Sequence, residues 1–401
     1  MKSLEKEKRE NSISLVGPNP FTPRSGQEPK VFIGRENELT TFKKHLEMAG
    51  KDRFDHFIVI GNWGTGKTTL LKEFRKHAQA HKVLTSFVSV HEFSDNNLQA
   101  PVVHLLTQIP RNLPIKFERL KHYSKYLQGV GITLPIIGGG IEIGEKEKFK
   151  GDPQDLLVQG LLELWQGLKE ETDSLVIFLD DVQNYDAVPQ FMSVLKNVLS
   201  DDDITKKTGY LFVLSATEEG WNQFLKKYHP IGRYFVPILK TSSFSEIKTL
   251  RIVEESLNGT RVSFSNDVKK LVYEYTEGHP YLLQIFCTYL FENQIKGSVG
   301  REQVDVAVTQ TLNELGPIIL DQLYSSASEQ EKIILQAMAA TYKTYSFNNV
   351  LRIIKQKKIR IGKGPLSTIL VRLAEKKLIV KIERGKYHIA NKLFNEFITR
   401  Q

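Results

Sequence analysis

One glycine-rich stretch, Ile58-Val59-Ile60-Gly61-Asn62-Trp63-Gly64-Thr65-Gly66-Lys67-Thr68-Thr69, constrains the fold of this chain more than any other feature. It fits the pattern G-x-x-x-x-G-K-[ST], between an apolar run that predicts a buried strand and helix-forming residues. Backbone N–H groups of such a loop point inward and hold phosphates, and the positive end of the following helix lies behind them. Lys67 is predicted to reach the β- and γ-phosphates, and the Thr68 hydroxyl is predicted to ligate magnesium. The flanks argue against an incidental surface turn, so Gly61 to Thr69 are candidate nucleotide contacts.

Apolar strands alternate with helical patterns over residues 31–240, which indicates a parallel sheet covered by helices on both faces. The expected strands are Phe57–Ile60, Val83–Val90, Leu175–Leu179, Tyr210–Leu214 and a short last strand, Tyr234–Ile238. The fold class is therefore α/β, with a P-loop nucleotide-binding core.

The rest of the chain divides into three further parts. Residues 1–30 carry four prolines and no periodic apolar pattern, so they are expected to form a mobile tail. Residues 241–326 have helical patterns only and are expected to form a lid. Residues 327–401 have the order helix, helix, helix, hairpin, helix, which is a winged-helix pattern. An insertion in the core, Gly131–Gly144, predicts a hairpin around a triple glycine, either a partner- or DNA-contacting element or a solvated cover of a sheet edge.

Polar side chains at the ends of two core strands are the candidate catalytic residues. Asp180 is expected to face the phosphates through magnesium or its water, and Asp181 to activate the attacking water. Ser215 and Thr217 end the next strand, where a hydroxyl can sense the γ-phosphate, position water, or only cap the strand end. Arg233 is a candidate for stabilising the transition state in cis or in trans, with an ordinary surface arginine as the alternative.

Together these features resemble AAA+ and related signal-transduction (STAND) ATPases, especially the origin-recognition-like and archaeal-type ATPase group. The resemblance covers about residues 19–401. Its carriers are Asn19-Pro20-Phe21, the stretch Phe32 to Leu39, the P-loop, Leu175 to Asp181, the strand ending at Thr217, Gly232-Arg233 and Gly278-His279-Pro280. It implies an AAA+-like sheet followed by an all-helical lid and a winged helix. It also implies that Phe32, Ile33, Gly34 and Arg35 line the adenine site, and that the turn Gly278, His279, Pro280 closes over the nucleotide.

Two departures from typical motors bear on turnover. Position 181 holds aspartate where many such ATPases keep glutamate, and no arginine follows the Gly278 turn, where initiator-type proteins carry a second sensor. Both departures favour a slow nucleotide-gated switch over a fast motor. The expected cofactors are ATP and magnesium. The sequence holds no Asn-Lys-x-Asp motif, which reads guanine. The prediction that the bound base is adenine rests on the resemblance.

Positive charge is concentrated at the C-terminal end. The net charge is +9, whereas residues 351–401 alone contain 14 Lys/Arg and 3 Glu, so the preceding part is close to neutral. In a winged helix the third helix enters the major groove and the wing contacts the backbone. The candidate contacts to double-stranded DNA are Arg372, Lys376 and Lys377 on the helix and Lys381, Arg384 and Lys386 on the wing. The alternative is a protein-binding or autoinhibitory winged helix with a solvated basic face.

The expected function is a slowly hydrolysing, ATP-binding AAA+/STAND-like ATPase that controls how its winged helix meets DNA or a partner. One alternative is a STAND-type signalling scaffold whose winged helix binds protein, and another is a DNA-binding regulator that no longer hydrolyses ATP. A homo-oligomer is a further expected assembly. No run of 18 apolar residues is present, so no membrane contact is expected, and the single cysteine, Cys287, fits core packing in a reducing cytoplasm.

Overall fold

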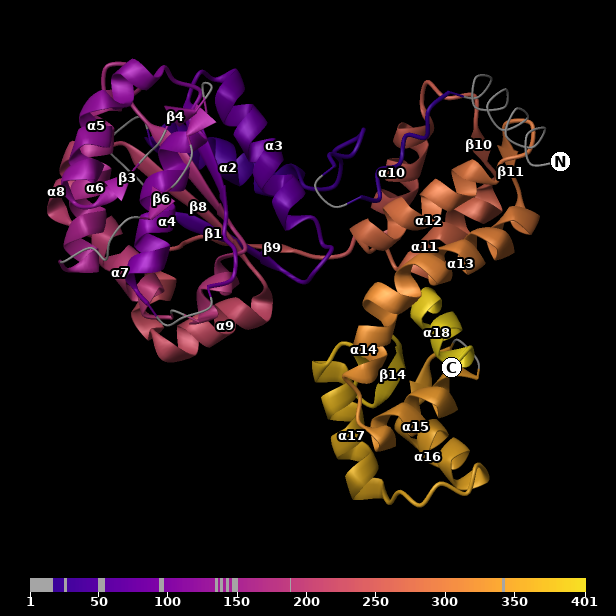
Figure 1. Ribbon diagram of the computed structural model, residues 1–401. Helices are drawn as coiled ribbons and strands as arrows, with labels where there is room; N and C mark the ends of the chain where they lie inside the picture. The colour runs from indigo at the N-terminus through magenta and orange to yellow at the C-terminus, as the bar shows by residue number, and fades with distance from the viewer. Residues whose placement is uncertain are drawn as a thin grey trace. The chain divides into compact units, whose positions relative to one another are not determined.

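The computed structural model describes residues 17–24, 27–49, 55–93, 97–133, 136–137, 140–141, 144–145, 151–187, 189–340 and 343–401 (Figure 1). They form two compact units. The core unit is Arg35–Ser242, and the helical unit combines the stretch before Arg35 with Ser243–Gln401.

A five-stranded parallel sheet forms the centre of the core unit. Its order is β2-β7-β8-β1-β9, with β1 (Phe57–Gly61), β2 (Leu84–Ser89), β7 (Leu175–Asp180), β8 (Tyr210–Ala216) and β9 (Ile238–Thr241). The α/β fold class and four of the predicted strands are confirmed. The last strand was predicted at Tyr234–Ile238 but begins only at Ile238, because Pro237 has no N–H to donate to a ladder.

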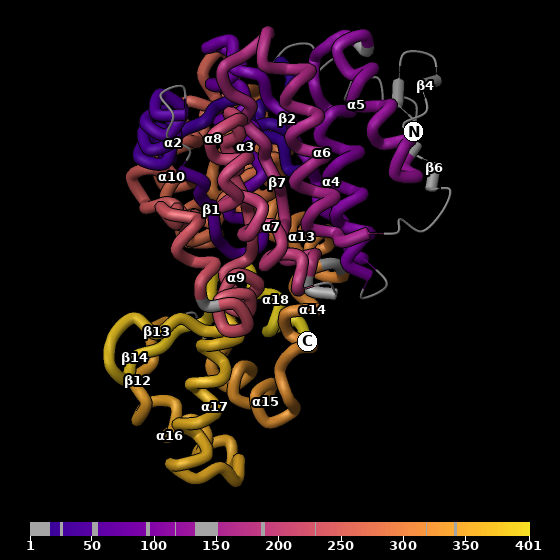
Figure 2. Tube along the Cα trace, turned by 90° about the vertical axis from the view of Figure 1, so that its left-hand side faces the viewer, coloured from indigo at the N-terminus to yellow at the C-terminus, as the bar shows by residue number. Residues whose placement is uncertain are grey.

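Helices cover both faces of this sheet, as the continuous apolar strands predict. They are α2 (Glu36–Ala49), α3 (Lys67–Ala80), α4 (Gln99–Arg111), α5 (Phe117–Gly129), α6 (Pro153–Leu168), α7 (Gln190–Leu199), α8 (Asp202–Lys207) and α9 (Glu218–Lys227), with 3-10 turns η1 (Val182–Ala187) and η2 (His229–Arg233). On one face Phe42 of α2 stacks on Phe74 of α3 at 4.4 Å between ring centroids. Phe42 also lies near Phe178 of β7, and Phe74 lies near Phe57 of β1. On the other face Ile58 and Ile177 join a core with α4, α6 and α7. Helix α4 packs beside β2, α6 lies beside α4, and α5 lies beside α6 (Figure 2).

The predicted insertion hairpin is present in the strands that the structure describes. Ile132–Thr133 (β3) pairs antiparallel with Gly144–Glu145 (β6), and Ile136–Ile137 (β4) with Gly140–Ile141 (β5). Gly138 and Gly139, at the centre of the triple glycine, lie outside the described residues.

The helical unit follows the predicted order of elements. Its first part holds α10 (Glu246–Leu257), α11 (Asn266–Thr276), α12 (Pro280–Glu292), α13 (Arg301–Leu315), a π turn η3 (Gly316–Leu320), α14 (Asp321–Ser325) and the short strands β10 (Ser263–Phe264) and β11 (Ser298–Val299). Its C-terminal segment, residues 327–401, holds α15 (Glu329–Ala339), β12 (Tyr345–Ser346), α16 (Phe347–Gln356), α17 (Lys363–Glu375), β13 (Ile379–Glu383), β14 (Lys386–Ile389) and α18 (Lys392–Thr399). The hairpin β13–β14 gains β12 as a third strand that the sequence pattern does not reveal. Among the described residues, no helix combines the length and apolarity that a membrane crossing requires.

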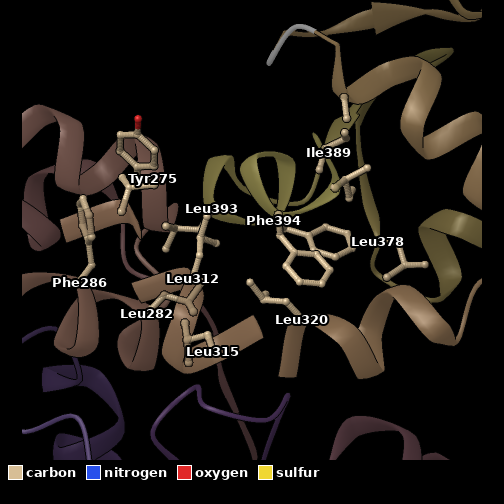
Figure 3. Close-up of a cluster of buried hydrophobic side chains, with 14 of the residues drawn as sticks. Tyr275, Leu282, Phe286, Leu312, Leu315, Leu320, Leu378, Ile389, Leu393 and Phe394 are labelled. Carbon is tan, nitrogen blue, oxygen red and sulfur yellow. The ribbon is translucent and has the colours of Figure 1, made fainter. Parts of the chain in front are cut away.

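One hydrophobic core runs through the whole helical unit. Leu393 and Phe394 of α18 lie between Leu315 and Tyr275 of the first helices and Leu378 before β13 (Figure 3). Cys287 on α12 is buried in the same core, as predicted. The hydrophobic core therefore continues across residue 326, where the boundary between a lid and a winged helix was expected.

The segment before α2 departs from the sequence expectation. Phe21 is only 3% exposed and stacks on Phe264, while the Asn19 side chain donates to the Thr288 carbonyl at 3.2 Å. Lys30 Nζ donates to the carbonyls of Ser256 and Asn258 at the end of α10. The mobile-tail prediction is thus wrong for residues 17–24 and 27–30, because a lone aromatic residue leaves no periodic trace of its tertiary contact.

Candidate nucleotide site

The P-loop joins β1 to α3. Two of its glycines are required by their backbone conformation, and a third is required by lack of space for a side chain. Gly64 and Gly66 have φ values of 70° and 87°, a region that side chains with a Cβ rarely adopt. Gly61 is needed for space, because a Cβ there would lie 2.0 Å from Thr241 Oγ1 on the neighbouring strand β9. That hydroxyl lies 2.8 Å from Thr65 Oγ1 and so holds the loop to the sheet.

Lys67 lies in the loop with its ammonium group turned onto the Asn62 carbonyl, at 3.4 Å. The residue is 7% exposed. Burial lowers the pKa of Lys67, and the nearby Asp181 and Asp180 carboxylates oppose that effect. The Lys67 ammonium group is thus positively charged and largely buried. The negative charge of a phosphate ligand would compensate this buried positive charge.

Thr68, Asp180 and Ser215 converge at the carboxyl edge of the sheet. Thr68 Oγ1 donates to Asp180 Oδ2 at 2.7 Å, and the fully buried Ser215 hydroxyl donates to Asp180 Oδ1. Burial and the adjacent Asp181 raise the pKa of Asp180, while these two hydrogen bonds and Lys67 oppose the shift. Hydroxyl and carboxylate oxygens in contact fit a hard cation such as magnesium.

Asp181 and Thr217 lie beside this cluster in different roles. The Asp181 N–H donates to Ser215 Oγ at 2.9 Å, so Ser215 contacts both acidic residues. Thr217 begins α9 as its N-cap, because its Oγ1 accepts from the Gly220 N–H at 3.1 Å. The structure thus places Ser215 against Asp180 and Asp181, and Thr217 caps a helix, not the strand end. Contact of either hydroxyl with the γ-phosphate stays a prediction.

The Arg35 guanidinium contacts the backbone of the P-loop. Its Nη2 donates to the Thr65 carbonyl at 3.0 Å and to the Ser242 carbonyl at 2.5 Å, and the guanidinium pairs with Glu38 at 3.5 Å. This contact with the loop backbone was not part of its predicted role at the adenine site.

The other residues of the predicted adenine side belong to the helical unit. The Phe244 N–H donates to the Gly278 carbonyl at 2.8 Å, and a Cβ at Gly278 would lie 2.0 Å from the Phe244 carbonyl. A Cβ at Gly34 would meet the Phe244 ring at 2.9 Å. The structure therefore brings Gly34 and Gly278, one residue from each predicted group, together on Phe244. Their contact with a nucleotide stays a prediction, and His279 itself caps α12 by accepting from the Leu282 N–H.

Arg233 lies at the opposite edge of the sheet from the P-loop. It lines a hollow of about 550 Å³ with His56, which precedes β1, and Tyr210, which begins β8. These are the amino ends of the strands, whereas Lys67 and Asp180 lie at the carboxyl ends. Within one core unit Arg233 is therefore not near the phosphates, and only the trans or surface alternatives remain.

The predicted DNA contacts split into two groups. Arg372 Nε and Lys376 Nζ of α17 pair with the carboxylate of Glu331, which is 1% exposed, at 3.1 and 2.6 Å. Burial opposes ionisation of Glu331, but hydrogen bonds from Lys376 and the Ser328 N–H and the charge of Arg372 leave its pKa lowered. These two cations thus hold α17 to α15. On the hairpin, Lys386 pairs with Glu383 at 3.1 Å.

A second set of solvent-exposed cations lies around the turn between α16 and α17. The end of α16, this turn and the first residue of α17 carry five cations within nine residues, and no acidic residue occurs from position 332 to 374. All five are exposed: Lys355, Lys357, Lys358, Arg360 and Lys363. Three of the predicted DNA contacts are exposed as well, namely Lys377 after α17 and Lys381 and Arg384 of the β13–β14 hairpin. We call the first five the basic turn.

A P-loop at the carboxyl edge of a parallel sheet, with Asp180 facing its threonine, defines the core unit as a P-loop NTPase fold of the AAA+ type. In agreement, residues 31–204 match a family model described as AAA ATPase domain. No curated protein matches the sequence.

Solved structures agree with this class over nearly the whole chain. The Walker-type ATPase PABY2304 of Pyrococcus abyssi is 15% identical, with a TM-score of 0.56 and coverage of 94% of this chain and 98% of that chain. The ORC2 protein of Aeropyrum pernix, in ADPNP–ADP complexes, is 15% identical, with a TM-score of 0.61 and coverage of 94% and 97%. Cdc6p of Pyrobaculum aerophilum is 14% identical, with a TM-score of 0.50 and coverage of 96% and 98%. At these identities the likeness establishes the fold.

Sequence reasoning missed two residues of the site. Thr241 crowds Gly61 from a strand about 180 positions away, and Gln183 binds the Asp181 carboxylate at 3.0 Å. Only Gln183 carried a local signal, since it lies two positions after Asp181.

Proposed function

We propose that this protein is an ATP-gated switch that hydrolyses ATP slowly to ADP and phosphate and controls the contact of its C-terminal segment with double-stranded DNA. The observation that carries the ATPase part is the convergence of Thr68, Asp180 and Ser215 beside Lys67. The nucleotides in the Aeropyrum pernix ORC2 structure support the same kind of ligand here.

Each residue of the site has a role in this reaction. The loop N–H groups and Lys67 bind the phosphates, and Thr68 with Asp180 would hold a magnesium ion, which neutralises phosphate charge. Asp181 takes up the proton of the attacking water. Aspartate is one methylene shorter than glutamate, so we expect it to orient that water less well and turnover to be slow.

Contacts within the helical unit support gating. The turn at Gly278 follows Glu277, whose carboxylate lies 3.3 Å from His388 Nδ1 on β14. Lys392 of α18 adds a pair with Glu274 at 3.4 Å. A movement of the turn on nucleotide exchange would therefore reach the C-terminal segment, which we interpret as a winged helix.

The DNA partner is proposed from charge. The basic turn with Lys381 and Arg384 presents cations at both ends of α17, a helix of 13 residues and so roughly 20 Å long. Between them α17 exposes the small residues Ser367 and Thr368, which permit close approach to a groove.

A second candidate function is a signalling scaffold whose C-terminal segment binds protein. Three apolar side chains of that segment favour it, since Val371, Val380 and Ile382 are 49%, 39% and 51% exposed. Exposed apolar side chains that gather on one surface are typical of protein contacts.

The deciding experiment is ATP turnover with and without duplex DNA at two salt concentrations, for wild type and Lys67→Ala. We expect Lys67-dependent turnover that DNA alters more at the lower salt concentration. Turnover that survives Lys67→Ala would contradict the site assignment. An absence of DNA binding and of any effect on turnover would favour the scaffold instead.

A further inference from the structure

We propose that Gln183 is the positioning residue that holds Asp181 in orientation for water activation, an inference that rests on the proposed ATPase function. Gln183 lies on η1, directly after the acidic pair. Its side-chain amide connects Asp181 to the first residues of α9, which belong to the next strand-to-helix connection.

The hydrogen bonds of Gln183 define its orientation. Nε2 donates to Asp181 Oδ1 at 3.0 Å, and Oε1 accepts from the Thr217 N–H at 3.1 Å. A backbone N–H can only donate, so the amide oxygen faces Thr217 and the NH₂ group faces Asp181. The contact to Asp181 is therefore a donor contact from a neutral group. It orients the carboxylate without supplying the positive charge that a lysine would bring.

Asp181 has a backbone that needs such support. Its φ is 62°, in the left-handed region, which costs an L-residue roughly 1–2 kcal/mol. The Ser215 hydroxyl accepts from its N–H at 2.9 Å, and its carbonyl accepts from the Asn184 N–H at 3.0 Å. Gln183 adds the contact to the carboxylate itself, so both the backbone and the side chain of Asp181 are held. Among the described residues the hydrogen bond to this carboxylate goes to Oδ1, so we assign Oδ2 to the attacking water.

Gly220 shows how tightly Gln183 is packed. A Cβ at Gly220 would lie 2.4 Å from Gln183 Cβ, closer than real side chains come. Gly220 also donates its N–H to Thr217 Oγ1, so it belongs to the first turn of α9 that receives Gln183. The side chain therefore has α9 on one side and Asp181 on the other. Because the atom that an alanine at 220 would meet is Cβ, Gly220→Ala should shift Gln183 through the backbone of η1 or α9 without removing any of its atoms.

The test compares Gln183→Ala, Gln183→Glu and Gly220→Ala with the matched control Gln223→Ala, an exposed glutamine on α9. Turnover at saturating ATP, the Kd for a non-hydrolysable ATP analogue and the Tm are measured for each. Gln183→Glu keeps the acceptor for Thr217 but replaces the donor to Asp181 with a second carboxylate, so it isolates the donor contact.

We expect kcat to fall about ten- to hundredfold in the three variants, since general-base catalysis contributes 10²–10⁴-fold and only its orientation is lost. Nucleotide Kd should stay within about twofold, because the side-chain hydrogen bonds of Gln183 among the described residues go to Asp181 and Thr217 and not to the P-loop. Wild-type kcat in Gln183→Glu, or a Kd that rises in proportion as kcat falls, would overturn the inference. If wild type itself shows no Lys67-dependent turnover, the proposed function fails and this role fails with it.

Discussion

At the scale of single residues, the site works because buried polar groups contact one another in a fixed arrangement. Ser215 contacts both acids, Arg35 contacts the P-loop backbone, and Thr241 crowds Gly61. Each of these contacts joins residues on different strands or on segments far apart in the sequence. Their removal should therefore affect chemistry and stability in separable ways.

Ser215→Ala should lower kcat about ten- to hundredfold, because Asp180 loses one of its two hydroxyl donors and the Asp181 N–H is left unpaired. The buried unpaired groups should also cost about 1–3 kcal/mol of unfolding free energy. Ser86→Ala is the matched control, since Ser86 is a fully buried serine on β2 that donates to the Ile109 carbonyl. Steady-state turnover and denaturant unfolding measure both effects. Equal kcat in the two variants would show that Ser215 acts only through stability.

His56 should make the core unit less stable in acid. Burial lowers the pKa of His56 to about 4, from an ordinary value near 6.5, while its Nδ1 accepts from the Phe212 N–H. The unfolded chain then binds more protons between these pH values, so this contribution is complete above pH 6.5 and is lost as the pH falls to 4. The loss amounts to about 3 kcal/mol. Denaturant unfolding at pH 7 and 4.5 should show a smaller difference in His56→Asn than in wild type, whereas the exposed control His81→Asn should resemble wild type.

At the scale of elements, contacts from distant segments decide where each helix lies. Glu331 lies between two cations of α17, and the segment around Phe21 docks on α12. The first contact buries Glu331 and engages two cations of the predicted DNA surface in ion pairs, although their side chains stay partly exposed. The second contact buries Phe21 and turns an expected tail into part of the helical unit.

Phe21→Ala should lower the unfolding free energy of the helical unit by about 3 kcal/mol, the range measured when a buried aromatic residue is truncated. The reason is the loss of its stacking on Phe264 and the cavity that remains. Ile247→Ala on α10 is the control, because Ile247 is 80% exposed. Its effect should stay below about 0.5 kcal/mol in denaturant unfolding. If the segment around Phe21 were a mobile tail, Phe21→Ala and Ile247→Ala would change the unfolding free energy equally little.

At the scale of the whole molecule, net charge alone does not locate a DNA-binding surface, because some of the cations pair with carboxylates of the same chain. The acid-free stretch from position 332 to 374 supplies the exposed basic turn. Arg372, Lys376 and Lys386 pair with carboxylates instead. The DNA-binding proposal therefore depends on cations outside the predicted recognition helix more than on those within it.

Replacing Lys355, Lys357, Lys358 and Arg360 together with glutamine should reduce the salt dependence of DNA binding. Each phosphate that the protein no longer neutralises lowers the slope of log K against log salt by about 0.9, so four phosphates correspond to roughly 3.6. Binding titrations on one duplex at several salt concentrations measure this slope. The exposed α2 pair Lys43→Gln and Lys44→Gln is the charge-removal control and should leave the slope unchanged. An unchanged slope in the fourfold variant would place the DNA surface elsewhere.

The sequence by itself determined the P-loop, the acidic strand end, the parallel α/β core and the order of the C-terminal elements. These follow from periodicity and short-range spacing, which act within one strand or one turn. Only the tertiary structure decided that Thr217 caps a helix, that Arg233 lies at the far edge of the sheet, and that Arg372 and Lys376 neutralise Glu331. Such pairings depend on which segments meet in space, and local pattern carries no record of them.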